Sequence, residues 1–256
     1  MGRIIAIANQ KGGVGKTTTA INLSAALAEA GKQVLTIDID PQGNTTSGLG
    51  VDKNSVELTV YDLILGECSI EESVIVTDFD NLYLIPSNVD LAAAEIELIG
   101  ISEKEYILQK AVKEIRDDYD YIIIDCPPSL NMLTINAMTT ADTVLVPIQC
   151  EYYALEGLSQ LIHTVNLVKA RLNPDLAMEG VVFTMYDART NLSLQVVENV
   201  KNNLQQRIYK TIIPRNVRLA EAPSHGLPIT VYDPKSTGAE SYRLLAQEVI
   251  NREGEL

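Results

Sequence analysis

The sequence predicts an α/β protein, a single domain over residues 1–256, with a mostly parallel, doubly wound sheet flanked by helices. Three observations predict it. Short runs rich in Ile and Val are apolar almost throughout, which is typical of strands buried on both faces. Stretches with helical periodicity separate these runs. A chain of 256 residues with 46% hydrophobic residues can enclose one large core, and no linker or internal repeat divides it.

The expected strands are short and have few polar residues. The run YIIIDC at 121–126 is an example. Because both faces of such a strand must be covered, helices are expected on both sides of a parallel sheet. We expect strands at 3–8, 33–38, 82–86, 121–126, 143–148, 180–185 and 210–214.

The expected helices lie between these strands. Gly31 follows NLSAALAEA and predicts a helix end there, because glycine readily adopts the left-handed conformation that ends helices. The pair Asn173 and Pro174 predicts another end. We expect helices at 16–30, 102–117, 130–141, 155–171, 193–206 and 238–252.

The last expected helix has one apolar face, which indicates a helix docked on the surface of the domain. A membrane-surface helix would need a polar face rich in Lys and Arg, which this segment lacks. The apolar residues are Tyr242, Leu245, Ala246 and Val249.

The stretch ANQKGGVGKTTTAINL, residues 8–23, joins the first expected strand to the first expected helix. That context is the one a phosphate-binding loop requires. Backbone N–H groups of such a loop point at bound phosphates, and glycines let the backbone approach closely. The strand–loop–helix context disfavours the alternative of a glycine-rich turn without a ligand. The glycines are Gly12, Gly13 and Gly15.

Three side chains that follow the glycines have distinct expected roles. Lys16 neutralises the charge of the β- and γ-phosphates, the Thr17 hydroxyl binds Mg²⁺, and Thr18 adds a phosphate contact. The loop therefore predicts a nucleotide together with Mg²⁺.

The loop departs from the general pattern G-x-x-x-x-G-K-[ST]. Gln10 occupies the first glycine position, and Lys11 follows it, five residues before Lys16. This deviant form, K-G-G-x-G-K-[ST], is a more specific signature than the general one. Because Lys16 already serves the phosphates of its own site, Lys11 could serve a nucleotide held by a second subunit. A merely solvated lysine is the alternative.

Carboxylates end two of the expected strands. Asp125 ends YIIID in the manner of a Walker-B strand, and its carboxylate is expected to reach Mg²⁺, through water. Asp38 and Asp40 follow the second strand, where ligands of α/β proteins bind. Asp40 is a candidate to orient the attacking water. Turn and cap chemistry is the alternative for an isolated D-x-D pair, and the role could also fall to Asp38.

The charge of the chain is −14, but it is unevenly distributed. Residues 1–177 hold 11 basic and 25 acidic residues, whereas 178–256 hold nine of each. Within 188–219 there is one acid, Glu198, and six basic residues. A local basic segment on an acidic protein keeps nucleic acid open as a partner. The basic residues are Arg189, Lys201, Arg207, Lys210, Arg215 and Arg218.

Several motifs together resemble the ParA/Soj-type chromosome-partition ATPases, relatives of MinD with a deviant Walker A loop. They are spread from about Arg3 to Val249, so the resemblance covers nearly the whole chain. The motifs are KGGVGKTTTAINL, DIDPQGNTTSGLG, IIIDCPPSL, PIQCEYYALEGLSQL, TMYDARTNL and IPRNVRLAEAPSHGLPI.

The resemblance implies a P-loop NTPase that binds ATP and Mg²⁺ and hydrolyses ATP. It implies an ATP-dependent homodimer that binds double-stranded DNA non-specifically and is stimulated by a ParB-type partner, in chromosome or plasmid segregation. The protein would be cytoplasmic and nucleoid-associated, with no membrane partner. The acidic first 177 residues are expected to attract a basic segment of the partner.

The resemblance also assigns residues. The lysine that reaches across the dimer to the partner's ATP falls on Lys11, and the water-activating aspartate falls on Asp40. The contacts to the adenine side fall on Pro214 and Asn216.

The DNA-facing arginines of the family fall on Arg189 and Arg218, both within the basic segment. Leu227 departs from the family, since relatives often have Lys at that position. This departure is expected to affect DNA affinity rather than ATPase activity.

Three other functions remain open on sequence alone. A MinD-like positioning ATPase shares the loop but needs an amphipathic C-terminal anchor, and this chain ends in the acidic RLLAQEVINREGEL. An iron–sulfur reductase of the nitrogenase type needs cysteines at set positions, whereas Cys68, Cys126 and Cys150 are isolated. An ATP-switched regulator of replication initiation or transcription would use the same dimer.

Overall fold

A computed structural model describes residues 1–151, 154–204 and 207–252. Three parts of the expectations above lie outside the described residues. They are the tyrosines at 152–153 within PIQCEYYALEGLSQL, the last two residues of the helix expected at 193–206, and the acidic end at 253–256.

The described strands form one eight-stranded sheet in the order β3-β4-β2-β5-β1-β6-β7-β8. Every described pair is parallel except β3 with β4. The mostly parallel sheet is confirmed. The strands are β1 Arg3–Ile7, β2 Val34–Asp38, β3 Ile75–Val76, β4 Leu82–Ile85, β5 Tyr121–Asp125, β6 Thr143–Gln149, β7 Ala177–Tyr186 and β8 Ile208–Pro214.

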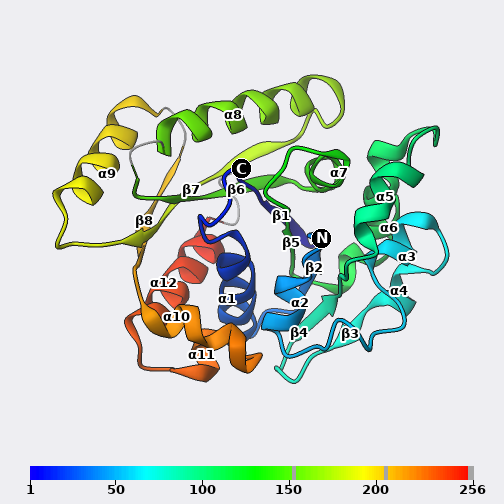
Figure 1. Ribbon diagram of the computed structural model, residues 1–256, viewed down its shortest axis with the longest axis horizontal. Coiled ribbons are helices and arrows are strands. Elements are labelled where there is room, and N and C mark those ends of the chain that lie inside the picture. Colours follow the sequence, from blue (N-terminus) through cyan, green and yellow to red (C-terminus); the bar gives the residue numbers. More distant parts are fainter. Residues whose placement is uncertain (152–153, 205–206, 253–256) are drawn as a thin grey trace.

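Helices cover both faces of the sheet (Figure 1). One face carries α1 Lys16–Glu29, α10 Val217–Glu221, α11 Ile229–Tyr232 and α12 Thr237–Asn251. The other carries α3 Val60–Leu65, α4 Ile70–Ser73, α5 Leu91–Glu97, α6 Ile107–Ile115, α7 Met132–Thr140, α8 Ala154–Arg171 and α9 Asn191–Asn203. The short helix α2, Asn44–Gly48, follows β2.

Two buried cores result from this arrangement, one on each face. In β1, Ile4 and Ala6 belong to one core, while Ile5 and Ile7 belong to the other. All four side chains are at most 2% exposed. The alternation of side chains along a strand therefore explains why the predicted strands are apolar throughout.

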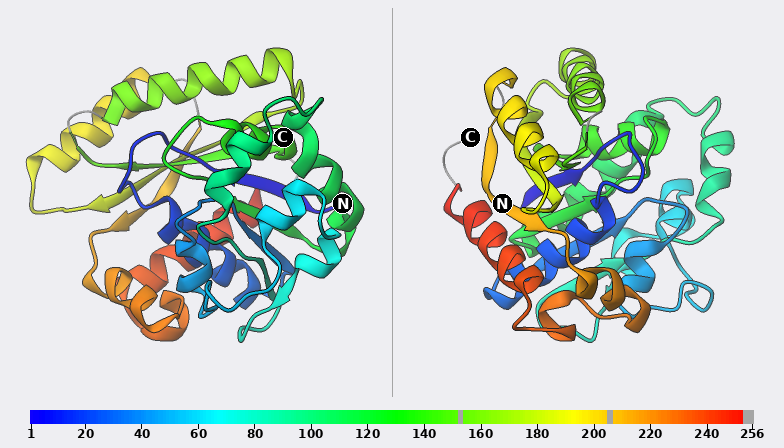
Figure 2. Two further views of the ribbon diagram at one scale, coloured as in Figure 1. Left: turned by 45° about the vertical axis from the view of Figure 1, so that its right-hand side comes forward. Right: turned by 60° about the vertical axis from the view of Figure 1, so that its left-hand side comes forward.

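The C-terminal helix is docked as expected. α12 packs beside α1 in all three views (Figures 1 and 2), and the Thr19 and Tyr242 hydroxyls are hydrogen-bonded at 3.2 Å. The four apolar residues of its expected face are at most 1% exposed. Within the described residues, no helix combines the length and apolar character needed to cross a bilayer.

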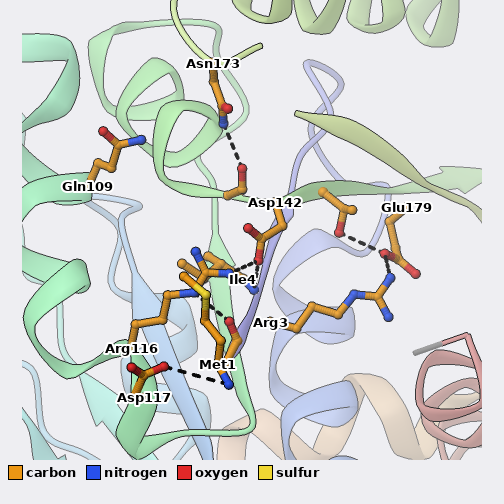
Figure 3. A network of polar contacts seen from close by, with 12 residues as sticks. Met1, Arg3, Ile4, Gln109, Arg116, Asp117, Asp142, Asn173 and Glu179 are labelled. Carbon is orange, nitrogen blue, oxygen red and sulfur yellow. Dashed lines mark hydrogen bonds and ion pairs between the residues drawn. The ribbon is translucent and has the colours of Figure 1, made fainter. Parts of the chain in front are cut away.

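A polar network fixes the amino ends of the central strands (Figure 3). Arg3 of β1 pairs with the buried Glu179 of β7, which also accepts hydrogen bonds from Thr143 and Tyr209. Beside it, Arg116 pairs with Asp142 at 2.7 Å. This network lies at the edge of the sheet opposite the carboxyl ends of the strands. It therefore stabilises the sheet at a distance from the candidate site, which lies at the carboxyl ends.

The expectations missed the short elements between β2 and β5. Strand β3 has two residues, and α2 to α5 have four to seven each, too few for a periodic pattern to be recognised. Capping boxes nevertheless mark two of these helices. Thr59 and Asp62 cap α3, and Ser69 and Glu72 cap α4.

Candidate functional site

The carboxyl ends of β1, β2 and β5 meet at one place on the sheet. Asp125 is in register with Ile7 on one side and with Asp38 on the other. The phosphate loop leaves β1 at this edge and turns into α1. Gly13 and Gly15 have φ values of 74° and 88°, which only glycine adopts readily. The local sequence thus fits a loop that curls over the strand ends.

Lys16 lies inside the hollow that the loop forms. Its side chain is 7% exposed, and its Nζ donates to the backbone oxygen of Lys11 at 3.2 Å. Burial lowers the pKa of its ammonium group, an effect opposed by Asp125 and Asp40. The ammonium is therefore held in position for an anion. The hollow is lined by Gly12, Gly13, Gly15, Lys16, Thr17, Thr18, Asp40, Gln42, Asn44, Pro128 and Met185.

The Asp125 carboxylate is held on one side only. Its Oδ2 accepts hydrogen bonds from the Thr17 hydroxyl at 2.8 Å and the Thr45 hydroxyl at 2.7 Å. Its Oδ1 is buried and has no hydrogen-bond partner among the described residues. Burial, with the nearby Asp38 charge, raises the pKa of Asp125 to about 7.

A divalent cation fits this arrangement. A buried carboxylate oxygen without a partner is costly, and a cation bound directly or through water would satisfy it. Carboxylate and hydroxyl oxygens are ligands that Mg²⁺ accepts. Asp125 and Thr17 are therefore the residues that would hold Mg²⁺ beside the phosphates.

Asp38 and Asp40 have different environments. Asp38 is fully buried, and its oxygens accept from the Asp40 N–H and from both the N–H and hydroxyl of Thr46. Burial raises its pKa to about 6. Asp40 is 7% exposed and lines the phosphate hollow, and its Oδ1 accepts only from Gln42 N–H among the described residues. Asp38 therefore shapes the turn, and Asp40 faces the hollow.

A second, more apolar cleft adjoins the phosphate hollow at Gly15 and Thr18. Pro214 and Asn216 line it, as the resemblance implies for an adenine site. The Asn216 side chain caps α10 by accepting from Arg218 N–H at 2.8 Å, and it donates to Thr237 at 2.9 Å. Ile213, Leu219 and Tyr242 supply apolar walls suited to a flat ring.

Lys11 points away from the hollow that contains Lys16. Its Nζ pairs with Glu151 Oε2 at 2.7 Å, and the two side chains are 38% and 45% exposed. Asn9 fixes the start of the loop by accepting from Lys11 N–H and donating to the Pro147 oxygen. The second lysine is thus neither in its own phosphate hollow nor simply solvated.

The two candidate DNA-binding arginines are exposed but paired. Arg189 makes two hydrogen bonds to Asp187, at 2.8 and 2.7 Å, and this pairing lowers the pKa of Asp187 to about 2. Arg218 pairs with Glu221 at 2.9 Å and with Asp233 at 3.5 Å. The basic segment is therefore less positive than its sequence alone suggests.

Sequence reasoning missed four residues that shape these sites. Thr45 and Thr46 hold Asp125 and Asp38, while Glu151 and Asp187 hold Lys11 and Arg189. The motif DIDPQGNTT contained the two threonines. Asp187 lies two residues before Arg189, directly before the basic segment 188–219.

Comparisons with known proteins show the family to which the chain belongs. The sequence matches the AAA domain family over residues 2–178. It is 59% identical to the sporulation initiation inhibitor protein Soj of Bacillus subtilis, covering 97% of this chain and 98% of that protein. It is 53% identical to the chromosome partitioning protein ParA of Myxococcus xanthus, covering 99% and 89%. Among solved structures, cobyrinic acid a,c-diamide synthase of Mycobacterium smegmatis with bound ADP and magnesium superposes with a TM-score of 0.89 at 38% identity, covering 100% and 97%.

The loop, its carboxylates and the matching domain define a P-loop ATPase, which binds ATP and Mg²⁺ and hydrolyses ATP. The chain is 50–59% identical to Soj proteins over nearly its full length, which identifies the family within this class. The chain belongs to the ParA/Soj family of chromosome-partitioning ATPases.

Proposed function

We propose that this ATPase is a DNA-partitioning switch. Two chains enclose ATP between them, the ATP-bound dimer binds DNA without sequence preference, and a ParB-type partner stimulates hydrolysis and so releases the DNA. The names of the relatives, Soj and ParA, support the partitioning role. The residues described above support the steps that involve ATP, the second chain and DNA.

The site residues divide the work on ATP. The loop N–H groups with Lys16 and Thr18 would bind the phosphates, and Pro214 and Asn216 would contact the base. Mg²⁺, held by Thr17 and Asp125, would neutralise charge on the β- and γ-phosphates. Asp40 faces the same hollow and would orient the attacking water.

The observation that carries the dimer proposal is the opposite orientation of the two lysines. Lys16 fills the hollow of its own loop, while Lys11 lies on the outside, tied to Glu151. An exposed ion pair is worth only about 1 kcal/mol or less, so ATP phosphates of a second chain can displace Glu151 readily. Lys11 would then complete the partner's site.

DNA binding would use the exposed basic segment in both chains. A dimer carries two copies each of Arg189 and Arg218. If each of these four arginines neutralised one phosphate, the slope of log affinity against log salt would be about −3.6. Because each arginine is already paired with a carboxylate, binding must break those pairs, so we expect a weaker slope than this.

A regulatory role is the second candidate. The name of the Bacillus subtilis relative, a sporulation initiation inhibitor, favours it. The same ATP switch would then act on replication initiation or transcription. A deletion strain would separate the two roles, because partitioning predicts chromosome loss at unchanged replication initiation.

The test is ATP hydrolysis measured with DNA, with a ParB-type protein from the same organism, with both, and with neither. We expect low basal turnover and the strongest stimulation with both present. A gel-shift titration with ATP, ADP and no nucleotide should show binding only with ATP. Equal DNA affinity with ADP and ATP, or no effect of the partner, would refute the proposal.

A further inference from the structure

One stretch of the chain carries a single sign of charge. Residues 54–103 hold eleven acidic residues and no Lys, Arg or His. In the fold this stretch includes α3, α4, β3, β4 and α5. α5 lies at one end of the longest axis of the molecule, and α9 of the basic segment lies at the other (Figure 1).

α5 is apolar on two opposite faces. On its inner face, Leu91, Ala94 and Leu98 are at most 1% exposed. On its outer face, Ile96 is 72% exposed, and Ile99, two residues past the end of the helix, is 73% exposed. An apolar face of a helix is expected to be covered by another surface.

The outer stripe extends beyond the helix itself. Val89, two residues before α5, is 72% exposed, and the Ala92 N–H donates to its carbonyl oxygen at 3.1 Å. Val89, Ala92, Ile96 and Ile99 are spaced by three, four and three residues, which is the spacing of an interhelical seam. Exposed single aliphatic residues are ordinary, but a continuous stripe marks an interaction surface.

Acidic side chains border this stripe. Asp90, Glu95, Glu97 and Glu103 come from the same stretch, and no cation lies among them in the sequence. Glu97 accepts hydrogen bonds from the Tyr61 hydroxyl, and Glu103 pairs with Lys110 at 2.6 Å. Because Lys110 neutralises Glu103, the negative charge of the border comes mainly from Asp90 and Glu97. The surface thus combines an apolar seam with a negative border.

We infer that the outer face of α5 docks a basic, amphipathic helical segment of a partner protein. The inference rests on the proposed function, in which that segment belongs to the ParB-type partner. Apolar residues of the segment would cover Val89, Ile96 and Ile99, and its lysines or arginines would face the acidic border. Pairing of α5 with the α5 of a second copy is opposed by charge, since it would set the two negative borders against each other.

The docking surface is connected to the nucleotide site. Glu95 contacts the Asn131 side chain, which caps α7 six residues after Asp125. At the other end of the segment, Ser87 donates its hydroxyl proton to the backbone oxygen of Asp40 at 2.8 Å. A helix bound on α5 would therefore act on two segments that adjoin Asp40 and Asp125 in the chain, the one at Ser87 and the one at Asn131. This connection suits a partner that stimulates hydrolysis.

The probe is a fluorescein-labelled 20-residue helical peptide with leucine at the seam positions and lysine and alanine elsewhere. Fluorescence anisotropy is measured with the full chain at low and moderate salt. We expect binding that weakens with salt and falls by about tenfold in the variant Ile96→Ser/Ile99→Ser. The control variant Leu167→Ser/Leu244→Ser, exposed leucines on α8 and α12, should bind as wild type does. Neutralising the border with Asp90→Asn/Glu97→Gln should weaken binding at low salt and remove most of the salt dependence.

Three outcomes would overturn the inference. The first is equal peptide affinity in wild type and in Ile96→Ser/Ile99→Ser. The second is equal affinity for a peptide with glutamate in place of lysine. The third is loss of ATP-dependent dimerisation in the isoleucine variant, which would assign the stripe to a second copy.

ATPase measurements separate this inference from the proposed function. With the ParB-type protein, the isoleucine variant should keep its basal turnover and lose stimulation. If the wild type is not stimulated at all, the proposed function fails while the peptide result still decides whether α5 is a docking surface.

Discussion

Lys16 is 7% exposed inside the phosphate hollow, whereas Lys11, five residues earlier, is exposed and paired with Glu151. The inner lysine is surrounded by groups that we propose act on one ATP: Thr17, Asp125 and Asp40. The outer lysine has one weak partner, and that partner is a surface carboxylate. The inner lysine thus has its partners within one chain, and we propose that the outer lysine finds its functional partner in a second chain.

This difference suggests how one loop could both bind ATP and make dimerisation depend on the bound ATP. Charge inside the hollow is shielded from solvent, so its interactions with phosphate are strong. Charge on the outside is solvated and gains little until a second surface excludes water. We therefore propose that ATP binding depends on Lys16 and dimerisation on Lys11.

The largest effect is expected from Lys16→Ala. It removes the cation that faces the β- and γ-phosphates in the same chain, so ATP affinity should fall by about 100-fold or more. Isothermal titration calorimetry with ATP and Mg²⁺ measures this. Affinity within a few-fold of wild type would mean that the hollow is not the phosphate site.

Asp40→Ala should leave ATP binding intact and reduce turnover by about 100-fold, because it removes the carboxylate that faces the hollow. The result is a long-lived ATP dimer, detected by size-exclusion chromatography with light scattering. Asp38→Asn is the comparison, since Asp38 is occupied by the turn and by Thr46. If Asp38→Asn alone blocked turnover without loss of stability, the roles would be exchanged.

Asp125→Asn should lose Mg²⁺-dependent turnover but stabilise the protein without nucleotide. The pKa of Asp125 is raised from about 3.9 in the unfolded chain to about 7 in the folded one. Its ionisation therefore destabilises the fold increasingly as the pH rises through this window, and fully above it. Melting temperatures should show a gain of about 5 °C at pH 8 and little gain at pH 4. A variant less stable than wild type at pH 8 would contradict this assignment.

The smallest effect is expected from Glu151→Gln. It removes the ion pair that holds Lys11 in the single chain, an exposed pair worth about 1 kcal/mol or less. ATP-dependent dimerisation should strengthen by roughly two- to fivefold at unchanged ATP affinity. Sedimentation over a range of protein concentrations measures the amounts of monomer and dimer. Weaker dimerisation of the variant would show that Glu151 itself contacts the second chain.

The sequence predicted the main strands, the phosphate loop and the carboxylates near it, because buried strands and glycine loops have strong local patterns. It named Asp40 rather than Asp38 as the candidate that orients water, and Asp40 is the one that lines the hollow. The physical reason was not visible in the sequence, because the turn and Thr46 occupy Asp38 only in the folded chain. It also could not show the partners of Lys11 and Arg189. Glu151 is 140 residues from Lys11 in sequence and meets it only through the folded sheet.

The short helix α5 was missed for a related reason. Its residues 91–97 are apolar on both faces, so they give no amphipathic signal, although the acidic stretch around them is plain in the sequence. The fold shows that one apolar face of α5 is buried against the domain and that the other is exposed.

The central claim, that Lys11 acts in the partner's site, is tested most directly by sedimentation of Lys11→Ala with saturating ATP and Mg²⁺. ATP affinity is measured on the same sample, beside Lys16→Ala and wild type. We predict that Lys11→Ala binds ATP within about threefold of wild type, because its own hollow is intact, yet sediments as a monomer under conditions where wild type is a dimer. Loss of ATP affinity as large as that of Lys16→Ala, or normal dimerisation of Lys11→Ala, would contradict the claim.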